Sequence, residues 1–177
     1  MKKFFKYNRV AAIGALVLII LLSVFCGVNR TVYSYKSKTE NAFSSSDGSV
    51  SSDLKKYKGY AEQFCAVAAA NGCDTGELEG LVSSLDGSDP FNGCGGILDE
   101  ISRRAAIVHA EFEAKNVADS QAKNTEISDF AEMSSTVMRL QNNKNYNNAA
   151  AKYNKAKNSF PANILAGKMP DAAVFDR

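Results

Sequence analysis

The chain has 177 residues and a formal net charge of +2, with no tryptophan, three prolines and twelve glycines. Four of its 21 basic residues fall within the first nine positions, and the remainder carries 17 basic against 19 acidic residues. Such a near-neutral remainder argues against a basic nucleic-acid-binding domain, so we expect no nucleic-acid partner. The length suits one domain plus a membrane segment.

The basic N-terminal segment, residues 1–9, precedes an uncharged run of 19 residues, Val10–Val28. At about 1.5 Å per residue this run can cross a hydrocarbon core of about 30 Å, which predicts a single transmembrane anchor at 10–28. Four basic residues precede the run and three follow it closely, which favours a cytoplasmic N-terminus and a domain outside the cytoplasm. A cleaved signal peptide and a lipoprotein modified at Cys26 remain alternatives.

Residues 29–166 form the predicted domain, and 167–177 a C-terminal tail. Residues 29–43 can continue the anchor helix until the Ser- and Gly-rich stretch 44–49 breaks it. A second helix is expected from Leu54 to Ala70, because Ser51-Ser52-Asp53 can cap its start and Asn71-Gly72 can end it. A Gly-rich loop is predicted at 71–96, with a short helix at 76–85.

Cys73 and Cys94 each follow an Asn-Gly pair, at the two ends of that loop. In a domain outside the cytoplasm they could form a disulfide, which would contribute roughly 3 kcal/mol. Another pairing and fully reduced thiols remain alternatives. Asp86-Gly87-Ser88-Asp89 lacks the spacing of a calcium loop, so we interpret it as a turn.

Between Ile97 and Phe160 there is neither glycine nor proline, which predicts long helices. Apolar residues recur at spacings of three and four over 98–112 and again over 127–137. We predict a turn at 118–124 and one helix over about 125–160. No segment alternates long enough for a sheet, so the predicted fold is all-α: a transmembrane helix followed by an antiparallel bundle of long helices.

The last predicted helix contains a Tyr-Asn pair repeated after seven residues. Tyr146, Tyr153 and Phe160 share one heptad position, and Ala149 and Ala156 share another. Large rings alternating with small side chains predict a coiled-coil-like seam against other helices. An exposed partner-binding stripe, a disordered Asn-rich linker and a homo-oligomer remain alternatives.

Charge is polarised along the chain. Residues 40–132 contain 17 acidic and seven basic residues, whereas 133–170 contain six basic and no acidic residues. The basic last helix could pair with the acidic helices before it. Alternatively Lys152, Lys155 and Lys157 could present a cationic face to an anionic lipid or polymer, or to an envelope protein.

Several of these residues resemble the LemA family of bacterial membrane proteins. Tyr146-Asn147, Ala149, Tyr153-Asn154, Phe160-Pro161 and Asn163 are similar to its Y-N-x-A…Y-N…F-P-x-N signature. Ala42-Phe43-Ser44 and Lys58-Gly59-Tyr60-Ala61 resemble its Ala-Trp-Ser and Lys-Gly-Tyr-Ala segments. The resemblance implies a one-pass anchor followed by long antiparallel helices in the cell envelope, in a family whose members are not known as enzymes.

His109, with Glu113 four residues later, is the one pair that could act as a general base with an orienting carboxylate. No nucleophile, metal or cofactor motif accompanies it, so we expect an interhelix or surface hydrogen bond instead. The predicted function is a non-catalytic envelope scaffold or partner-binding module. The alternative is a secreted or surface ligand-binding module that uses the disulfide-closed loop 72–96.

Overall fold

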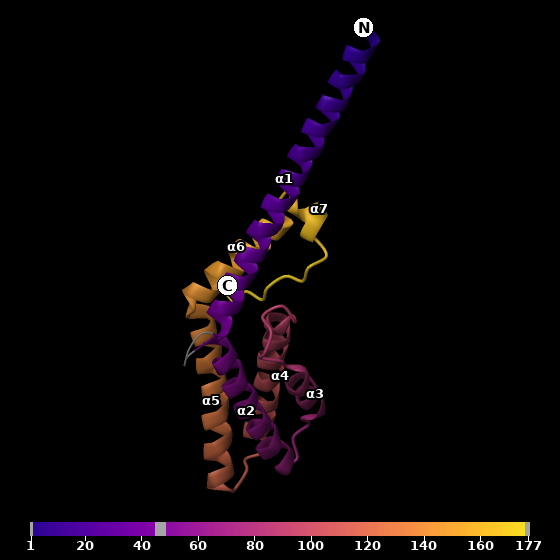
Figure 1. The fold of residues 1–177 in the computed structure, drawn as a ribbon. Helices are drawn as coiled ribbons and strands as arrows, with labels where there is room; N and C mark the ends of the chain where they lie inside the picture. The colour runs from indigo at the N-terminus through magenta and orange to yellow at the C-terminus, as the bar shows by residue number, and fades with distance from the viewer. Residues whose placement is uncertain (1, 45–48, 176–177) are drawn as a thin grey trace.

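The computed structural model describes residues 2–44 and 49–175. Within these residues the fold is all-helical, as predicted (Figure 1). The helices are α1 (Lys2–Ser44), α2 (Val50–Ala70), α3 (Gly76–Ser84), α4 (Cys94–Ala114), α5 (Ser120–Asn142), α6 (Lys144–Asn158) and α7 (Ala162–Ala166).

Helix α1 projects far beyond the rest of the molecule (Figure 1). Its side chains from Ala11 to Gly27 are all exposed, and among the described residues it holds the one helical stretch that is long and apolar enough to cross a membrane, with a hydropathy of 2.8. From Val28 onward α1 packs against the domain, chiefly along α6 and α7. One continuous helix therefore serves both as the candidate anchor and as a core element.

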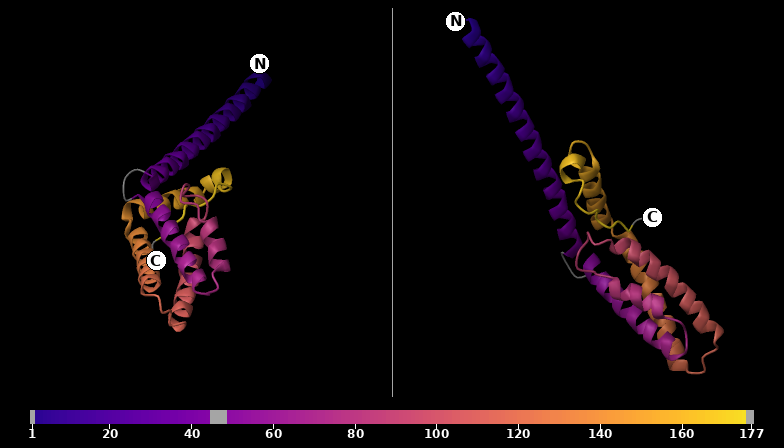
Figure 2. Two further views of the ribbon diagram at one scale, coloured as in Figure 1. Left: turned by 90° about the horizontal axis from the view of Figure 1, so that it is seen from below. Right: turned by 90° about the vertical axis from the view of Figure 1, so that its right-hand side faces the viewer.

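The half of the domain farther from the N-terminus of α1, the distal half, is a bundle of α2, α4 and α5, with α3 lying against α4 (Figure 1). Helices α2 and α5 run antiparallel and make the largest interface (Figures 1 and 2). The apolar positions of α4, at residues 98, 101, 105, 108 and 112, are all buried, which confirms the predicted stripe. Tyr57 and Phe64 of α2 are fully buried, and each such side chain contributes about 1.5–3 kcal/mol.

The proximal half is formed by α1, α6 and α7. Val32, Thr39 and Phe43 of α1 are buried, and the Phe43 ring lies 5.6 Å from the Tyr146 ring of α6. Two segments that carry the family resemblance are thus packed against each other.

The predicted single helix over 125–160 is wrong, because it breaks at Asn143. This residue has φ −75° and ψ 75°, ends α5 and caps α6 by accepting a hydrogen bond from the Tyr146 N–H at 3.1 Å. Similarly, α5 begins at Ser120 because Asp119 caps it, inside the predicted turn. The short helix in the 71–96 region is confirmed as α3, whereas Cys94 already lies in α4.

Candidate functional site

The predicted aromatic seam of α6 is only partly correct. Tyr146 and Tyr153 are fully buried. The small residue packed between them is Ala150, whereas the predicted Ala149 and Ala156 are only partly buried. Phe160, by contrast, is 80% exposed, because α6 ends at Asn158 and Ser159 is extended at φ −87° and ψ 147°. Phe160 precedes Pro161, and a residue before a proline disfavours the helical conformation. The helix therefore ends before Phe160, although the heptad spacing continues to it.

The two buried tyrosines bind the backbone of the chain's last described segment. We call residues 169–175 the strap, and Tyr146, Asn147, Tyr153 and Asn154 the Tyr-Asn ladder. The Tyr146 hydroxyl donates to the Ala173 carbonyl at 2.7 Å, and the Tyr153 hydroxyl donates to the Pro170 carbonyl at 3.1 Å. Burial raises the pKa of both hydroxyls, so they remain neutral donors.

The two asparagines of the ladder bind the same segment. Asn154 accepts from the Ala172 N–H at 2.8 Å and donates to its carbonyl at 2.9 Å. Asn147 accepts from the Phe175 N–H at 3.0 Å. Its amide also donates to two carbonyls freed where α5 ends, those of Leu140 and Gln141, each at 3.1 Å. Asn147 therefore joins the α5–α6 break to the strap.

The spacing of the ladder matches the spacing of the strap. Successive ladder residues of each type are seven positions apart, about 10.5 Å along a helix. Their partners in the strap are three positions apart, about 10 Å along an extended chain. Each Tyr-Asn pair therefore forms hydrogen bonds to the backbone of one tripeptide, and the two pairs together hold an extended segment antiparallel to α6.

Lys157 secures the start of the strap and is not part of an open cationic face. It is only 3% exposed, donates to the Met169 carbonyl at 2.8 Å and lies 2.5 Å from the Asp171 carboxylate. The Lys157 contact lowers the pKa of Asp171. The prediction that Lys157 faces an anionic partner is wrong, because the neighbouring strap covers it.

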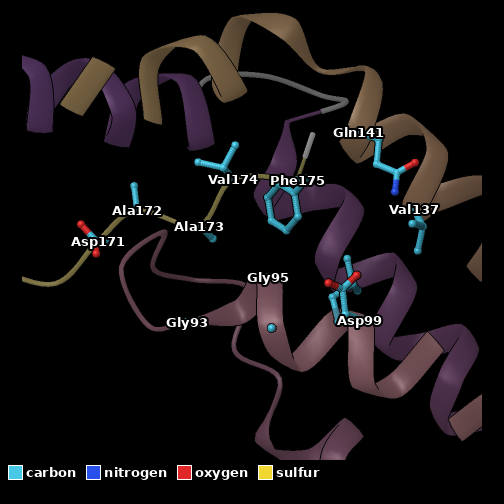
Figure 3. A pocket seen from close by; sticks show the side chains of 12 residues that line it. Gly93, Gly95, Asp99, Val137, Gln141, Asp171, Ala172, Ala173, Val174 and Phe175 are labelled. Carbon is cyan, nitrogen blue, oxygen red and sulfur yellow. The ribbon is translucent and has the colours of Figure 1, made fainter. Parts of the chain in front are cut away.

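The strap also closes a cavity of about 290 Å³ against the start of α4 and the end of α5. Figure 3 shows it passing above Gly93 and Gly95, with Phe175 at its end above α4 and the side chains of Asp99, Val137 and Gln141 across the cavity. A Cβ on Gly95 would lie 3.5 Å from the Ala173 Cβ, which is ordinary van der Waals contact, so the strap packs directly on this turn of α4. The tail predicted at 167–177 is thus, up to residue 175, a packed part of the domain.

Away from the ladder, residues of α6 and of the neighbouring α1 line an open groove of about 590 Å³. We call it the cationic groove, since three lysines and three asparagines line it and no acidic residue does. Its lining residues are Tyr35, Lys38, Asn41, Ala42, Lys144, Asn145, Asn148, Ala149 and Lys152. Of the three predicted cationic residues, Lys152 lies in the groove, whereas Lys155 is exposed outside it.

The groove contains two lysines that were not predicted. Lys38 comes from α1 and Lys144 from the first turn of α6, and neither belongs to the predicted cationic face of Lys152, Lys155 and Lys157. The signal that was available is the absence of acidic residues from both 29–39 and 133–170. What the sequence did not show is that these two stretches pack side by side.

The predicted Cys73–Cys94 bridge is not formed. The four cysteines, all within the described residues, are free. Cys94 begins α4, whereas Cys73 lies near its far end, since a Cβ on Gly72 would be 3.8 Å from Lys115 Nζ. A helix of 21 residues is about 30 Å long, and a disulfide needs Cα atoms within about 7 Å. The alternative function required a loop closed by this disulfide, and that disulfide is not formed.

His109 makes an interhelix hydrogen bond, as expected, but to an unpredicted partner. Its Nδ1 lies 2.7 Å from Glu126 Oε1 of α5, whereas Glu113 is 3.8 Å from Nε2. The ring stacks on Phe130 at 4.2 Å. Glu126 is fully buried and lies near Asp129, whose pKa is raised by burial and by the Glu126 charge. This pair belongs to the packing of α4 against α5.

Comparisons with known proteins returned no match: no family model matches the chain, no curated protein is significantly similar, and no solved structure is significantly similar to its fold. Among residues 2–44 and 49–175, no group of three or more His, Cys, Asp or Glu side chains could hold a metal ion. The candidate site is therefore defined by geometry alone: the cationic groove on one side of α6 and the strap on the other.

Proposed function

We propose that this protein is a membrane-anchored, LemA-like module of the bacterial cell envelope, without catalytic activity, that binds an anionic partner in the cationic groove. The observation that carries the proposal is the lining of that groove, which includes Lys38, Lys144 and Lys152 and no carboxylate. Three cations in one concave site raise the local concentration of anions. The three asparagines add donors that can bind phosphate or carboxylate oxygens.

The position of the groove favours a macromolecule over lipid headgroups. Its α1 residues, Tyr35 to Ala42, lie seven to fourteen positions beyond Val28. At 1.5 Å per residue this is about 10–21 Å past the end of the apolar run. A headgroup layer adds only about 5–8 Å to each side of the hydrocarbon core. The groove therefore opens above the headgroups, where an anionic wall polymer or the acidic segment of an envelope protein would lie.

The proposed topology places this groove outside the cytoplasm. The charge bias across the anchor supports that orientation. The substitution Ile127→Cys, on the exposed surface of α5 and in a Cys26→Ser background, tests on which side of the membrane the domain lies. Labelling of Ile127→Cys by an impermeant maleimide in intact cells is expected, and labelling only after the cells are opened would reverse the topology.

Replacing the three groove lysines with glutamine tests the binding function. The triple variant Lys38→Gln, Lys144→Gln, Lys152→Gln is compared with a control triple of the same charge change on exposed lysines elsewhere, Lys55→Gln, Lys56→Gln, Lys123→Gln. The full chain in mild detergent is titrated with inorganic polyphosphate and with polyglutamate. We expect at least tenfold weaker binding for the groove triple and less than twofold for the control. Equal weakening of both would show diffuse charge attraction and refute the groove.

A further inference from the structure

Three large apolar side chains are exposed around α7. Phe160 is 80%, Ile164 73% and Leu165 40% exposed, and we call these three the α7 patch. The other side of α7 is buried through Ala162 and Ala166. The short helix is therefore amphipathic, with small residues towards the domain and large ones away from it. Large apolar side chains that are exposed near one another, unlike single ones, are typical of surfaces that bind a partner or a membrane.

The α7 patch lies where the domain meets the exposed apolar part of α1. Helix α7 contacts α1, and both Figure 1 and the right-hand view of Figure 2 place it beside α1 on the side of the domain nearest the N-terminus. Val28, the last residue of the apolar run, is also the first part of α1 that packs against the core. Helix α7 therefore lies beside α1 on the side of the domain from which the exposed apolar run, residues 11–27, projects.

The surroundings of the patch are cationic. No acidic residue occurs in 29–39 or in 133–170, the stretches that supply this end of α1 and the whole of α6 and α7. Arg30, Lys155 and Lys168 are exposed there. Basic side chains beside an apolar surface are complementary to a bilayer that contains anionic lipids.

We propose that the α7 patch is a second membrane contact, which inserts Phe160, Ile164 and Leu165 into the boundary between headgroups and acyl chains of the leaflet from which α1 emerges. Apolar faces of interfacial helices lie about 5–10 Å deep in that boundary. The proposal rests on the proposed anchor but not on the cationic groove. The bilayer is chosen over a protein partner because α7 lies beside α1 where the candidate membrane span ends, and because the exposed residues around it are basic.

The test measures the depth of single labels in the full chain, reconstituted at one chain per nanodisc in phosphatidylcholine with phosphatidylglycerol. An environment-sensitive fluorophore is attached at Ile164→Cys in a Cys26→Ser background, where the other three cysteines are buried. Ile127→Cys is the matched control, an isoleucine on α5 that is 53% exposed. Native Cys26, exposed on α1, reports on the anchor in a third sample.

The label at Ile164→Cys is expected to emit at shorter wavelength, to be quenched by shallow doxyl lipids and to be protected from aqueous iodide, whereas the Ile127→Cys label shows the reverse. Equal behaviour of these two labels would overturn the proposal. Protection from iodide without lipid quenching, seen only in discs loaded with two or more chains, would assign the patch to a second copy and also overturn it. Quenching at Cys26 alone would keep the anchor and reject the α7 contact, whereas no quenching at Cys26 would reject the anchor itself.

Discussion

Asn147 is the residue whose removal should most clearly expose the role of the Tyr-Asn ladder. Its buried side chain makes three hydrogen bonds, to Leu140, Gln141 and Phe175. At about 1 kcal/mol each, Asn147→Ala loses about 3 kcal/mol, of which the better helix propensity of alanine restores about 0.5 kcal/mol. For a chain of this size, 1 kcal/mol corresponds to about 2–4 °C in Tm, so a fall of roughly 5–10 °C is expected.

The adjacent Asn148 provides the control. It is exposed, and among the described residues its side chain has no hydrogen-bond partner, so Asn148→Ala should leave Tm unchanged or slightly raised. Thermal unfolding of the full chain in mild detergent, followed by circular dichroism at 222 nm, measures both. If the two variants melt within about 2 °C of each other, the strap contributes nothing through Asn147 and the ladder is not a binding device.

Three further predictions follow from buried ionisable groups. Burial and the nearby Glu126 charge raise the pKa of Asp129, so the folded chain keeps that proton to higher pH than the unfolded chain does. The free energy of unfolding should therefore fall as pH rises towards and through the raised pKa, and Asp129→Asn should remove this fall and raise Tm at pH 7. Identical Tm values of the native chain at pH 4 and pH 7 would contradict this prediction. Lys157→Ala should lower Tm and make the strap sensitive to protease, while the exposed Lys155→Ala should do neither. Burial raises the pKa of Cys94 to about 11, so its thiol should resist alkylation in the native state and react in denaturant without a reductant; a requirement for reductant would restore a disulfide.

Patterns that report burial of one helical face predicted the fold well. The stripe of α4 was correct because its spacing of three and four directly records the side that meets the core. The α5–α6 break at Asn143 was missed because the residues around it tolerate a helix. What ends α5 is a pair of asparagine side chains, Asn143 and Asn147, that satisfy backbone groups, and such bonds have no periodic signature.

The candidate site was predicted only where a single helix supplies it. Lys152 is exposed, as the predicted cationic face requires, but Lys38 joins it in the groove from a segment more than a hundred residues away, and no local pattern records that pairing. The strap escaped prediction for a different reason. The ladder binds mostly its backbone groups, so residues 169–175 carry little side-chain pattern that would identify them as packed structure.

Helix α1 is unbroken, so a change in the tilt of its exposed half would be transmitted to the domain packed on its other half. The same helix contains the exposed apolar residues 11–27 and, near its end, Phe43 in the core, and it has no proline to act as a hinge. Membrane helices adjust their tilt to bilayer thickness. If α1 is the proposed anchor, any such adjustment would rotate α6 and the helices packed on it through the same angle, and the direction in which Lys38 and Lys152 face would follow the thickness of the bilayer.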